Sequence, residues 1–234
     1  FNRDDVEKRR RKTETLNYWD SQYMLEAKPV GEVRLDPERF VPYDCEPRFE
    51  RSNGVATMWL GSVRIVGAVL RWDPSSGKTK SDKSAYVLDM SDDIGRHYWH
   101  RVGAATGEIA TTTEDGRKVI GGQVMQLVAV VREFRVPLVV VETNGIGKFA
   151  PSILRMALKQ AGITCAVREV DQRANKNKRI LEALQPLLDS KMLWAHLSAL
   201  DGPLWDEATH WNPAVPDQPD DILDAGAGAV TDQP

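Results

Sequence analysis

The sequence predicts an α/β domain with a mixed sheet, in which three antiparallel strands come first, parallel strands follow, and helices flank the sheet. Apolar segments rich in β-branched residues recur between Met58 and residue 105 and indicate the first three strands. The run Leu138–Val141 is apolar at every position, which is typical of a strand covered by helices on both faces. Segments with helical spacing precede and follow this run, so we expect a strand–helix–strand unit with parallel pairing.

Composition is that of one large domain with appendages. The chain has 234 residues, of which 41% are hydrophobic, so it can bury a substantial core. Its 31 basic and 34 acidic residues give a net charge of −3, so any contact with nucleic acid has to come from local patches. Cys45 and Cys165 lie outside any zinc-binding spacing and are expected to be reduced thiols.

No apolar stretch approaches the roughly 18 residues of a membrane span, and the N-terminus has no apolar core behind its basic residues. We therefore expect a soluble protein without a targeting segment, and because the chain begins at Phe1 we expect a fragment or a processed product. Residues 1–50 are charged and then without a clear pattern, which predicts a linker or lead-in, and residues 51–234 would form the globular domain. The basic run at residues 8–12 could touch DNA, but we interpret it as a solvated helix face.

In the first half of this domain, residues 58–72 predict one long strand with a bend at Gly67, ending at Asp73. Residues 84–93 and 97–106 predict two more strands, and the turn-like sequence between them indicates an antiparallel meander. Residues 118–134 carry an apolar stripe with helical spacing and predict an amphipathic helix packed on the sheet.

In the second half, the buried strand at Leu138–Val141 leads to Glu142 at its carboxyl end. We expect a helix over 148–161 closed by Gly162, a strand over 163–170, and a helix over 175–190. A short strand over 191–196 and two helical regions over 199–211 and 220–230 complete the prediction.

Acidic residues occur at three places where predicted elements begin or end. They are Asp73, Glu142 and the group Asp220, Asp221 and Asp224. Hard divalent cations such as Mg²⁺ take oxygen ligands, and two ions roughly 4 Å apart can hold the attacking and leaving oxygens of a phosphoryl transfer. The pattern therefore predicts a metal-dependent nuclease.

Each acidic residue also has a simpler interpretation. The Asp-Pro at residue 73 could be only a turn, and the Asp pair at 220–221 could be only a helix cap. Glu142 is the stronger evidence because a carboxylate after four apolar strand residues is costly to bury without a partner, although that partner could be a salt bridge.

The sequence SSGKT at residues 75–79 resembles the end of a phosphate-binding loop, but the required first glycine would be residue 72, which is Trp. A strand rather than a helix is predicted to follow, so we interpret this segment as a hairpin tip whose Lys78 could meet a DNA phosphate.

A basic cluster between a strand and a helix is the other candidate for phosphate contacts, with a solvated helix start as the alternative. Its members are Arg173, Lys176, Lys178 and Arg179.

The four histidines share no ligand spacing, and each is expected to be a packed or surface residue. His100 and Arg101, on the third predicted strand, are minor candidates for substrate contact.

The order of elements resembles the ribonuclease H-like fold, and the motifs more narrowly resemble the nuclease domain of phage terminase large subunits. SQYML at residues 21–25 is similar to the segment that links motor and nuclease, and WDPSSGKTKSDKSAY from residue 72 is similar to the first acidic motif. VVVETNGIG from residue 139 and DDILDA from residue 220 are similar to the second and third. The resemblance covers nearly the whole chain.

This resemblance implies a nuclease that cleaves double-stranded DNA during viral genome packaging, in the cytoplasm of the infected bacterium, using two Mg²⁺ or Mn²⁺ ions. It implies Asp73, Glu142 and Asp221 as catalytic metal ligands, with Asp220 and Asp224 as close alternatives and Asp82 as a further ligand or outer partner.

The implied partners are an ATPase motor domain upstream in the same polypeptide, joined through residues 1–50, together with the portal and the small terminase subunit. Little sequence preference is expected, because lysine and arginine contacts to phosphates do not read bases. Two alternatives remain open at this point: a DNA-clamping or docking module of the motor without catalysis, and a related junction resolvase or integrase-like nuclease.

Overall fold

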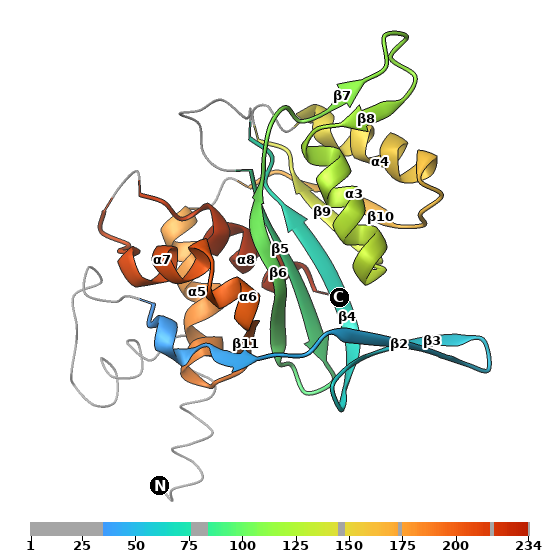
Figure 1. Ribbon diagram of the computed structural model, residues 1–234. Coiled ribbons are helices and arrows are strands. Elements are labelled where there is room, and N and C mark those ends of the chain that lie inside the picture. The colour runs from blue at the N-terminus through green and yellow to red at the C-terminus, as the bar shows by residue number, and fades with distance from the viewer. Residues whose placement is uncertain (1–34, 76–83, 145–147, 173–174, 216–217, 234) are drawn as a thin grey trace, which may run out of the picture.

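The computed structural model describes residues 35–75, 84–144, 148–172, 175–215 and 218–233 (Figure 1). The basic run at 8–12, the SQYML segment, Lys78, Asp82 and Arg173 lie outside the described residues. The strands are β1 Val41–Tyr43, β2 Pro47–Ser52, β3 Val55–Leu60, β4 Val63–Trp72, β5 Ser84–Asp92, β6 His97–Ala105, β7 Thr111–Thr112, β8 Val119–Gly121, β9 Leu138–Glu142, β10 Ala166–Val170 and β11 Leu193–His196. The helices are the 3₁₀ turn η3 Pro37–Arg39, α3 Gln123–Phe134, α4 Ala150–Gln160, α5 Lys176–Asp189, α6 Leu197–Leu200, α7 Pro203–His210 and α8 Asp221–Asp232.

The centre of the main sheet has the strand order β6-β5-β4-β9-β10. β4, β5 and β6 pair antiparallel, whereas β4, β9 and β10 pair parallel. This arrangement confirms the predicted mixed sheet of three antiparallel strands followed by parallel ones. Because β4 and β9 are neighbours that run in the same direction, their carboxyl ends lie at the same edge of the sheet.

The N-terminal part of the sheet differs from the prediction. The single long strand expected over residues 58–72 is a hairpin, because Gly61 turns the chain with a φ of 60° and β3 folds back antiparallel to β4. Gly67, where a bend was expected, lies beside an irregularity in the β4–β5 register.

Residues ahead of the expected boundary at residue 50 also belong to the sheet. β1 pairs parallel with β11, and β2 pairs antiparallel with β3 in a ribbon that extends away from the body in Figure 1. Part of the segment expected as a lead-in over residues 1–50 thus pairs within the sheet. These strands lack a clear sequence signal because β2 has no fully buried residue and β1 has only three residues.

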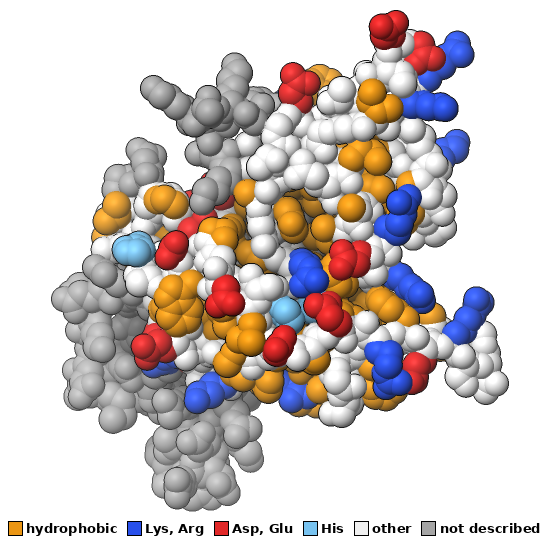
Figure 2. Space-filling view, in the orientation of Figure 1, with side chains coloured by type: hydrophobic (Ala, Val, Ile, Leu, Met, Phe, Trp, Pro, Cys, Tyr) orange, Lys and Arg blue, Asp and Glu red, His pale blue; other side chains and the backbone are white. Residues whose placement is uncertain are grey.

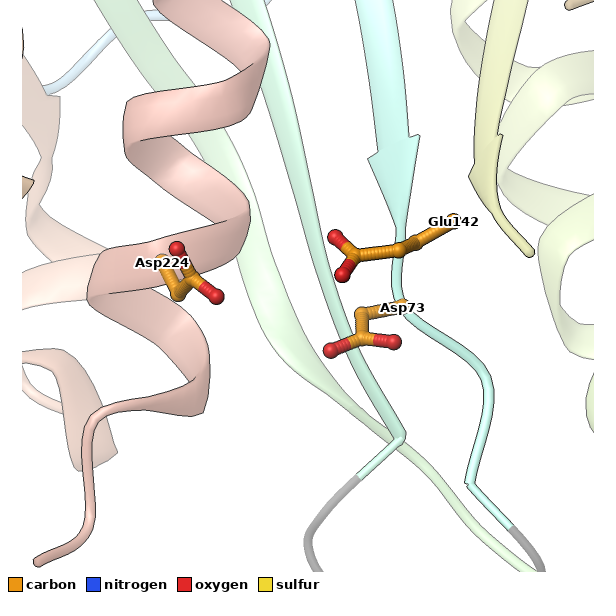
Figure 3. A group of neighbouring side chains, drawn as sticks. All are labelled: Asp73, Glu142 and Asp224. Carbon is orange, nitrogen blue, oxygen red and sulfur yellow. The ribbon is translucent and has the colours of Figure 1, made fainter. Parts of the chain in front are cut away.

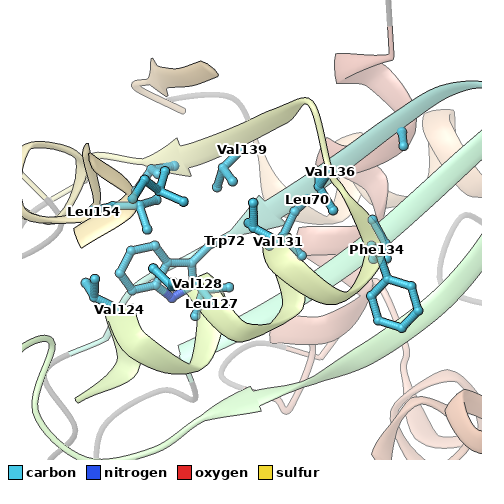
Figure 4. Packing of buried hydrophobic residues seen from close by; sticks show 14 of the residues in the cluster. Leu70, Trp72, Val124, Leu127, Val128, Val131, Phe134, Val136, Val139 and Leu154 are labelled. Atoms are coloured by element: carbon cyan, nitrogen blue, oxygen red, sulfur yellow. The ribbon is translucent and has the colours of Figure 1, made fainter. Parts of the chain in front are cut away.

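Helices cover both faces of the sheet, with α3 and α4 on one side and α5 to α8 on the other (Figure 1). On the first side, Val124, Leu127 and Val131 of α3 are fully buried against β4 and β9 (Figure 4). A buried aliphatic side chain of this kind contributes roughly 1.5–3 kcal/mol by leaving water. The predicted amphipathic stripe thus forms one of two hydrophobic cores, and the second lies under α5, α7 and α8.

α8 lies directly on the sheet because small residues form its contact face. A Cβ added at Gly226 would lie 2.2 Å from Cη2 of Trp99, a fully buried residue of β6. The glycine therefore allows the helix backbone to approach the indole more closely than any other residue would.

Within the part of the chain that the structure describes, no helix combines the length and apolar character that crossing a membrane requires.

We expect Gly226→Ala to destabilise the domain by about 1–2 kcal/mol, because overpacking against Trp99 costs up to about 3 kcal/mol and the gain in helix propensity returns only about 1 kcal/mol. Urea unfolding followed by circular dichroism measures the change. Gly121→Ala is the matched control, since its Cβ would make only an ordinary contact of 3.4 Å with Thr111. Equal midpoints for the two variants would contradict the close approach of α8.

Candidate metal centre

Three carboxylates converge at the edge of the sheet where β4 and β9 end. Asp73 follows β4, Glu142 ends β9, and Asp224 lies in the first turn of α8 (Figure 3). One carboxylate oxygen from each lies within 4.8 Å of the others. Among the described residues this is the only group of three or more such side chains with a spacing suited to a metal ion.

Asp73 is placed by hydrogen bonds around the end of β4. Its backbone amide donates to the Ala85 carbonyl at 2.9 Å, which extends the pairing with β5 past the last strand residue. The indole of Trp72 donates to the Ser84 hydroxyl at 2.8 Å, and that hydroxyl donates to Gln123 of α3 at 2.6 Å. The buried Trp72 thus anchors the chain immediately before the carboxylate.

Glu142 is placed by the parallel register of β9 and β4, in which Val141 pairs with Trp72. Its side chain is 9% exposed, and both of its carboxylate oxygens accept hydrogen bonds. Arg71 donates to Oε2 at 2.8 Å, and Asn144 donates to Oε1 at 2.7 Å. The sequence had left a salt bridge open as an alternative to a metal for Glu142, and the structure shows that the salt bridge is present.

Asp224 is held by a second arginine. The Nε and Nη2 atoms of Arg179, on α5, both donate to its Oδ1, and the Nε distance is 2.9 Å. The helix N-terminus itself is fixed by the buried Glu207 of α7, whose Oε2 accepts from the amides of Ile222 and Leu223. A carboxylate in the first turn also interacts favourably with the helix dipole.

Asp73 is the carboxylate without such an anchor. Within the described residues, no side chain makes a hydrogen bond or an ion pair to it. Burial, followed by the negative charges of Glu142 and Asp224, raises the pKa of Asp73 to about 7, and the nearby Lys176 opposes this shift only in part. The proton on Asp73 is thus bound more tightly than in an exposed aspartate, because Lys176 compensates the ionised form only in part.

The third position of the group is Asp224, whereas the sequence favoured Asp221. Asp220 and Asp221 lie instead against Lys176, whose Nζ is 2.5 Å from Asp220 and 3.4 Å from Asp221. Burial alone would lower the pKa of Lys176, but the hydrogen bond with Asp220 and the charge of Asp224 raise it above its ordinary value. Asp221 and Asp224 are one turn apart on α8, and only the docking of the helix decides which faces β4.

Several residues predicted to touch DNA are engaged within the protein. Lys176 contacts the Asp220–Asp221 pair, and Arg179 is bound to Asp224. Lys178 has a side chain that is 72% exposed and makes an ion pair of 3.4 Å with Glu182. On the face drawn in Figure 2, basic side chains lie mainly on the right and acidic ones mainly in the centre and on the left. Which of these residues contact DNA stays a prediction.

His100 is fully buried, which confirms its interpretation as a packed residue. The Tyr43 hydroxyl lies 3.0 Å from its Nδ1, and Glu46 lies 2.9 Å from its Nε2. Burial lowers the pKa of His100 to about 4, so the ring is neutral at neutral pH. Arg101 contacts the same Glu46 at 3.3 Å, so both side chains link β6 to the segment that follows β1.

Three residues that position the carboxylates were not predicted from the sequence: Arg71, Asn144 and Glu207. A signal existed for Arg71, because it is the only charge in the apolar stretch from Ile65 to Trp72 and directly precedes the first acidic motif. Asn144 lies in the second motif, two residues after Glu142. Glu207 had no signal, since its function depends on the meeting of α7 and α8.

The strand order and the acidic group at the carboxyl ends of β4 and β9 define a nuclease domain of the ribonuclease H-like class. A family model described as the ribonuclease H-like domain of the bacteriophage T7 terminase matches residues 72–193, more than half of the chain. The chain belongs to this family, and the resemblance to the nuclease domain of phage terminase large subunits is confirmed.

Two solved structures are remotely similar. A yeast mitochondrial Holliday junction resolvase has a TM-score of 0.45 and 12% identity, over 70% of this chain and 78% of the other. A mutant nuclease domain of the large terminase subunit of bacterial virus Sf6, with manganese and beta-thujaplicinol, has a TM-score of 0.43 and 10% identity, over 70% of this chain and 88% of the other. A search of curated protein sequences gave no match. The family assignment rests on the sequence match.

The raised pKa of Asp73 predicts a pH-dependent effect of Asp73→Asn on stability. Because the folded pKa of about 7 exceeds the unfolded value of about 3.9, the contribution of this carboxyl to stability is fully present below pH 4 and is lost as the pH rises through 7. In metal-free buffer at pH 8, Asp73→Asn should therefore stabilise the domain by about 1–3 kcal/mol after solvent screening.

The gain should shrink toward zero near pH 4, and thermal unfolding in EDTA at both pH values measures it. Asp201→Asn, at an exposed position outside the acidic group, is the control and should have no such pH-dependent effect. A destabilising effect of Asp73→Asn at pH 8 would show that a cation already compensates this carboxylate.

Proposed function

We propose that this domain is a Mg²⁺- or Mn²⁺-dependent endonuclease that cleaves double-stranded DNA during viral genome packaging by a two-metal mechanism. The observation that carries the proposal is the convergence of Asp73, Glu142 and Asp224 from three separate elements within 4.8 Å of one another. Clustered carboxylates repel, so a protein that keeps them together has a site that cation binding relieves. Membership of the terminase family makes DNA the substrate that fits this site.

The donor set fits the proposed ions. All three ligand groups are carboxylates, and the group contains no imidazole or thiolate. Oxygen-only donors favour hard ions such as Mg²⁺ and Mn²⁺ over zinc. Asp73, Glu142 and Asp224 would hold the ions, with Asp221 and Asp220 as possible further ligands on the flank of the centre. Asp82 lies outside the described residues and stays a prediction as a further ligand.

The chemistry that bound ions of this kind supply is activation of a water for in-line attack on phosphorus and stabilisation of the departing 3′ oxygen. The protein residues hold the ligand carboxylates in position and compensate part of their negative charge. Arg71 and Asn144 fix the two oxygens of Glu142, and Arg179 fixes one oxygen of Asp224, so each carboxylate keeps a defined orientation. Of the three carboxylates, Asp73 would gain most from a bound cation, because no side chain among the described residues donates a hydrogen bond to its ionised form.

Lys176 would assist the approach of DNA. Its ammonium lies against Asp220 and Asp221, 3.9 Å from Asp224, and its side chain is 37% exposed. A positive charge at this place offsets part of the repulsion between the acidic centre and an incoming phosphate. The exposed Lys178 is the further candidate for a phosphate contact on α5.

In the whole protein, we propose that an ATPase motor domain lies upstream and that the portal and the small terminase subunit are partners, in the cytoplasm of the infected bacterium. The nuclease domain would include β1 and β2 and so begin before residue 50, because both strands pair within its sheet. Residues before residue 35 would form the connection to the motor. Cleavage should show little sequence preference, because lysine and arginine contacts to phosphates do not read bases.

Incubation of supercoiled plasmid with Mn²⁺ or Mg²⁺ should give nicked and linear products. We expect Asp73→Ala and Asp224→Ala to reduce cleavage by more than about a hundredfold, since the loss of a ligand exceeds the effect typical of outer partners. Asp221→Ala should lower it by less than about tenfold, because Asp221 borders the group rather than belonging to it. Initial rates from gel densitometry give the comparison, with Asp201→Ala as the surface control.

Full activity of Asp224→Ala together with loss of activity in Asp221→Ala would make Asp221 the third ligand. Salt-sensitive DNA binding without metal-dependent cutting would favour the clamping alternative instead. A strong preference for branched over linear duplex would favour a resolvase-like activity.

A further inference from the structure

Arg71 is a buried cation at the centre of the domain. Its side chain is 1% exposed, and a guanidinium keeps its charge at any relevant pH. Nη2 donates to Oε2 of Glu142 at 2.8 Å, and Nη1 donates to Oδ2 of Asp232 at 2.6 Å. The arginine therefore joins the end of β9 to the last residue of α8.

The packing around Arg71 is adapted to this position. A Cβ added at Gly228 would lie 2.9 Å from Nε and 3.0 Å from Cζ of Arg71, so α8 carries a glycine where the guanidinium passes. On the outer side, Arg168 of β10 donates to Oδ1 of Asp232 at 2.6 Å. A continuous chain of charges thus runs from the half-exposed Arg168 through Asp232 and Arg71 to Glu142.

The same helix carries Asp224 in its first turn and Asp232 at its last residue. When α8 docks on the sheet, Asp224 enters the acidic group and Asp232 holds the second arm of Arg71. The orientation of Glu142 is thereby linked to the arrival of Asp224, although these two residues come from different elements.

We propose that Arg71 is a positioning residue of the metal centre, which holds Glu142 in its ligand orientation once α8 has docked. The inference rests on the proposed function. Arg71 touches neither metal nor DNA in this account, and it acts through Glu142 alone. Asn144 holds the other oxygen of Glu142, but Asn144 is exposed, whereas Arg71 is anchored on two sides inside the protein.

A purely structural role for this buried ion pair is the competing account, because removal of one partner of such a pair commonly destabilises a fold. A lysine in place of Arg71 separates the positioning role from the purely structural role. It keeps the positive charge, so the electrostatic environment of the centre changes little. It is a single point charge that cannot donate in a fixed geometry to carboxylates on both sides. Arg71→Lys therefore tests geometry rather than charge.

The experiment measures Mn²⁺ binding by isothermal titration calorimetry, with circular dichroism to establish folding, and plasmid cleavage across a Mn²⁺ series. We expect Arg71→Lys to raise the Kd for Mn²⁺ by about tenfold, the lower end of the effect of outer partners of metal ligands. Cleavage should fall at limiting Mn²⁺ and recover at saturating Mn²⁺, with an unchanged KM for DNA. Asp232→Asn, which removes the negative charge at the second anchor of Arg71 but keeps one acceptor oxygen, should raise the Kd by less than the roughly tenfold expected for Arg71→Lys.

Arg155→Lys is the matched control, since Arg155 makes an exposed ion pair of 2.8 Å with Glu169 and should bind Mn²⁺ like the wild type. Wild-type Mn²⁺ affinity in Arg71→Lys, or a cleavage defect that saturating Mn²⁺ does not restore, would overturn the inference. If Arg71→Lys fails to fold, unchanged Mn²⁺ affinity in Asp232→Asn overturns it instead. A wild-type domain that binds no Mn²⁺ would overturn the proposed function, and this inference with it.

Discussion

The mutual repulsion of three carboxylates held within 4.8 Å is the constraint on which the rest of the structure depends. The chain meets it asymmetrically: Arg71 compensates Glu142, Arg179 compensates Asp224, and Asp73 stays without such a partner among the described residues. Two ligand groups are therefore rigid and partly neutralised. The third, Asp73, keeps a negative charge that favours the binding of a cation. Burial and the charges of Glu142 and Asp224 raise the pKa of Asp73, as expected for a carboxylate without such a partner. The same arrangement lowers the stability of the metal-free domain, as is common where a site is kept ready for a ligand.

α8 is the element through which stability and the site are connected. Its small residues let it lie against the Trp99 indole and the Arg71 guanidinium, and larger side chains at Gly226 or Gly228 would push it away from both. The amides at its start are satisfied by Glu207 of α7 rather than by its own N-cap residue, which makes no side-chain cap. The acidic group is thus assembled by tertiary packing, and weaker docking of α8 would affect Asp224 and Glu142 together.

The sequence predicted the features that depend on local pattern and missed those that depend on tertiary docking. The central strands and Glu142 at the end of a buried strand followed from apolar runs, because burial on both faces leaves a direct trace in composition. The sequence favoured Asp221, but it could not separate Asp221 from Asp224. The two residues lie one turn apart on α8, and their spacing does not show which one faces the sheet. The contacts of Arg71 could not be foreseen, because Asp232 lies 161 residues away in the chain. The hairpin at Gly61 was missed because strands on both sides of it are apolar.

The charges around the centre also bear on how two ions could bind under the proposed function. The carboxylates and cations joined by the contacts described above are Asp73, Glu142, Asp220, Asp221, Asp224 and Asp232, with Arg71, Arg168, Lys176 and Arg179. With Asp73 ionised, carboxylates outnumber cations among these described residues, and under the proposed function a divalent ion would relieve their repulsion. A second ion would add positive charge to the same partly buried place, and the phosphates of DNA would bring the anions that offset it. The second ion should therefore bind more tightly when DNA is present than when it is absent.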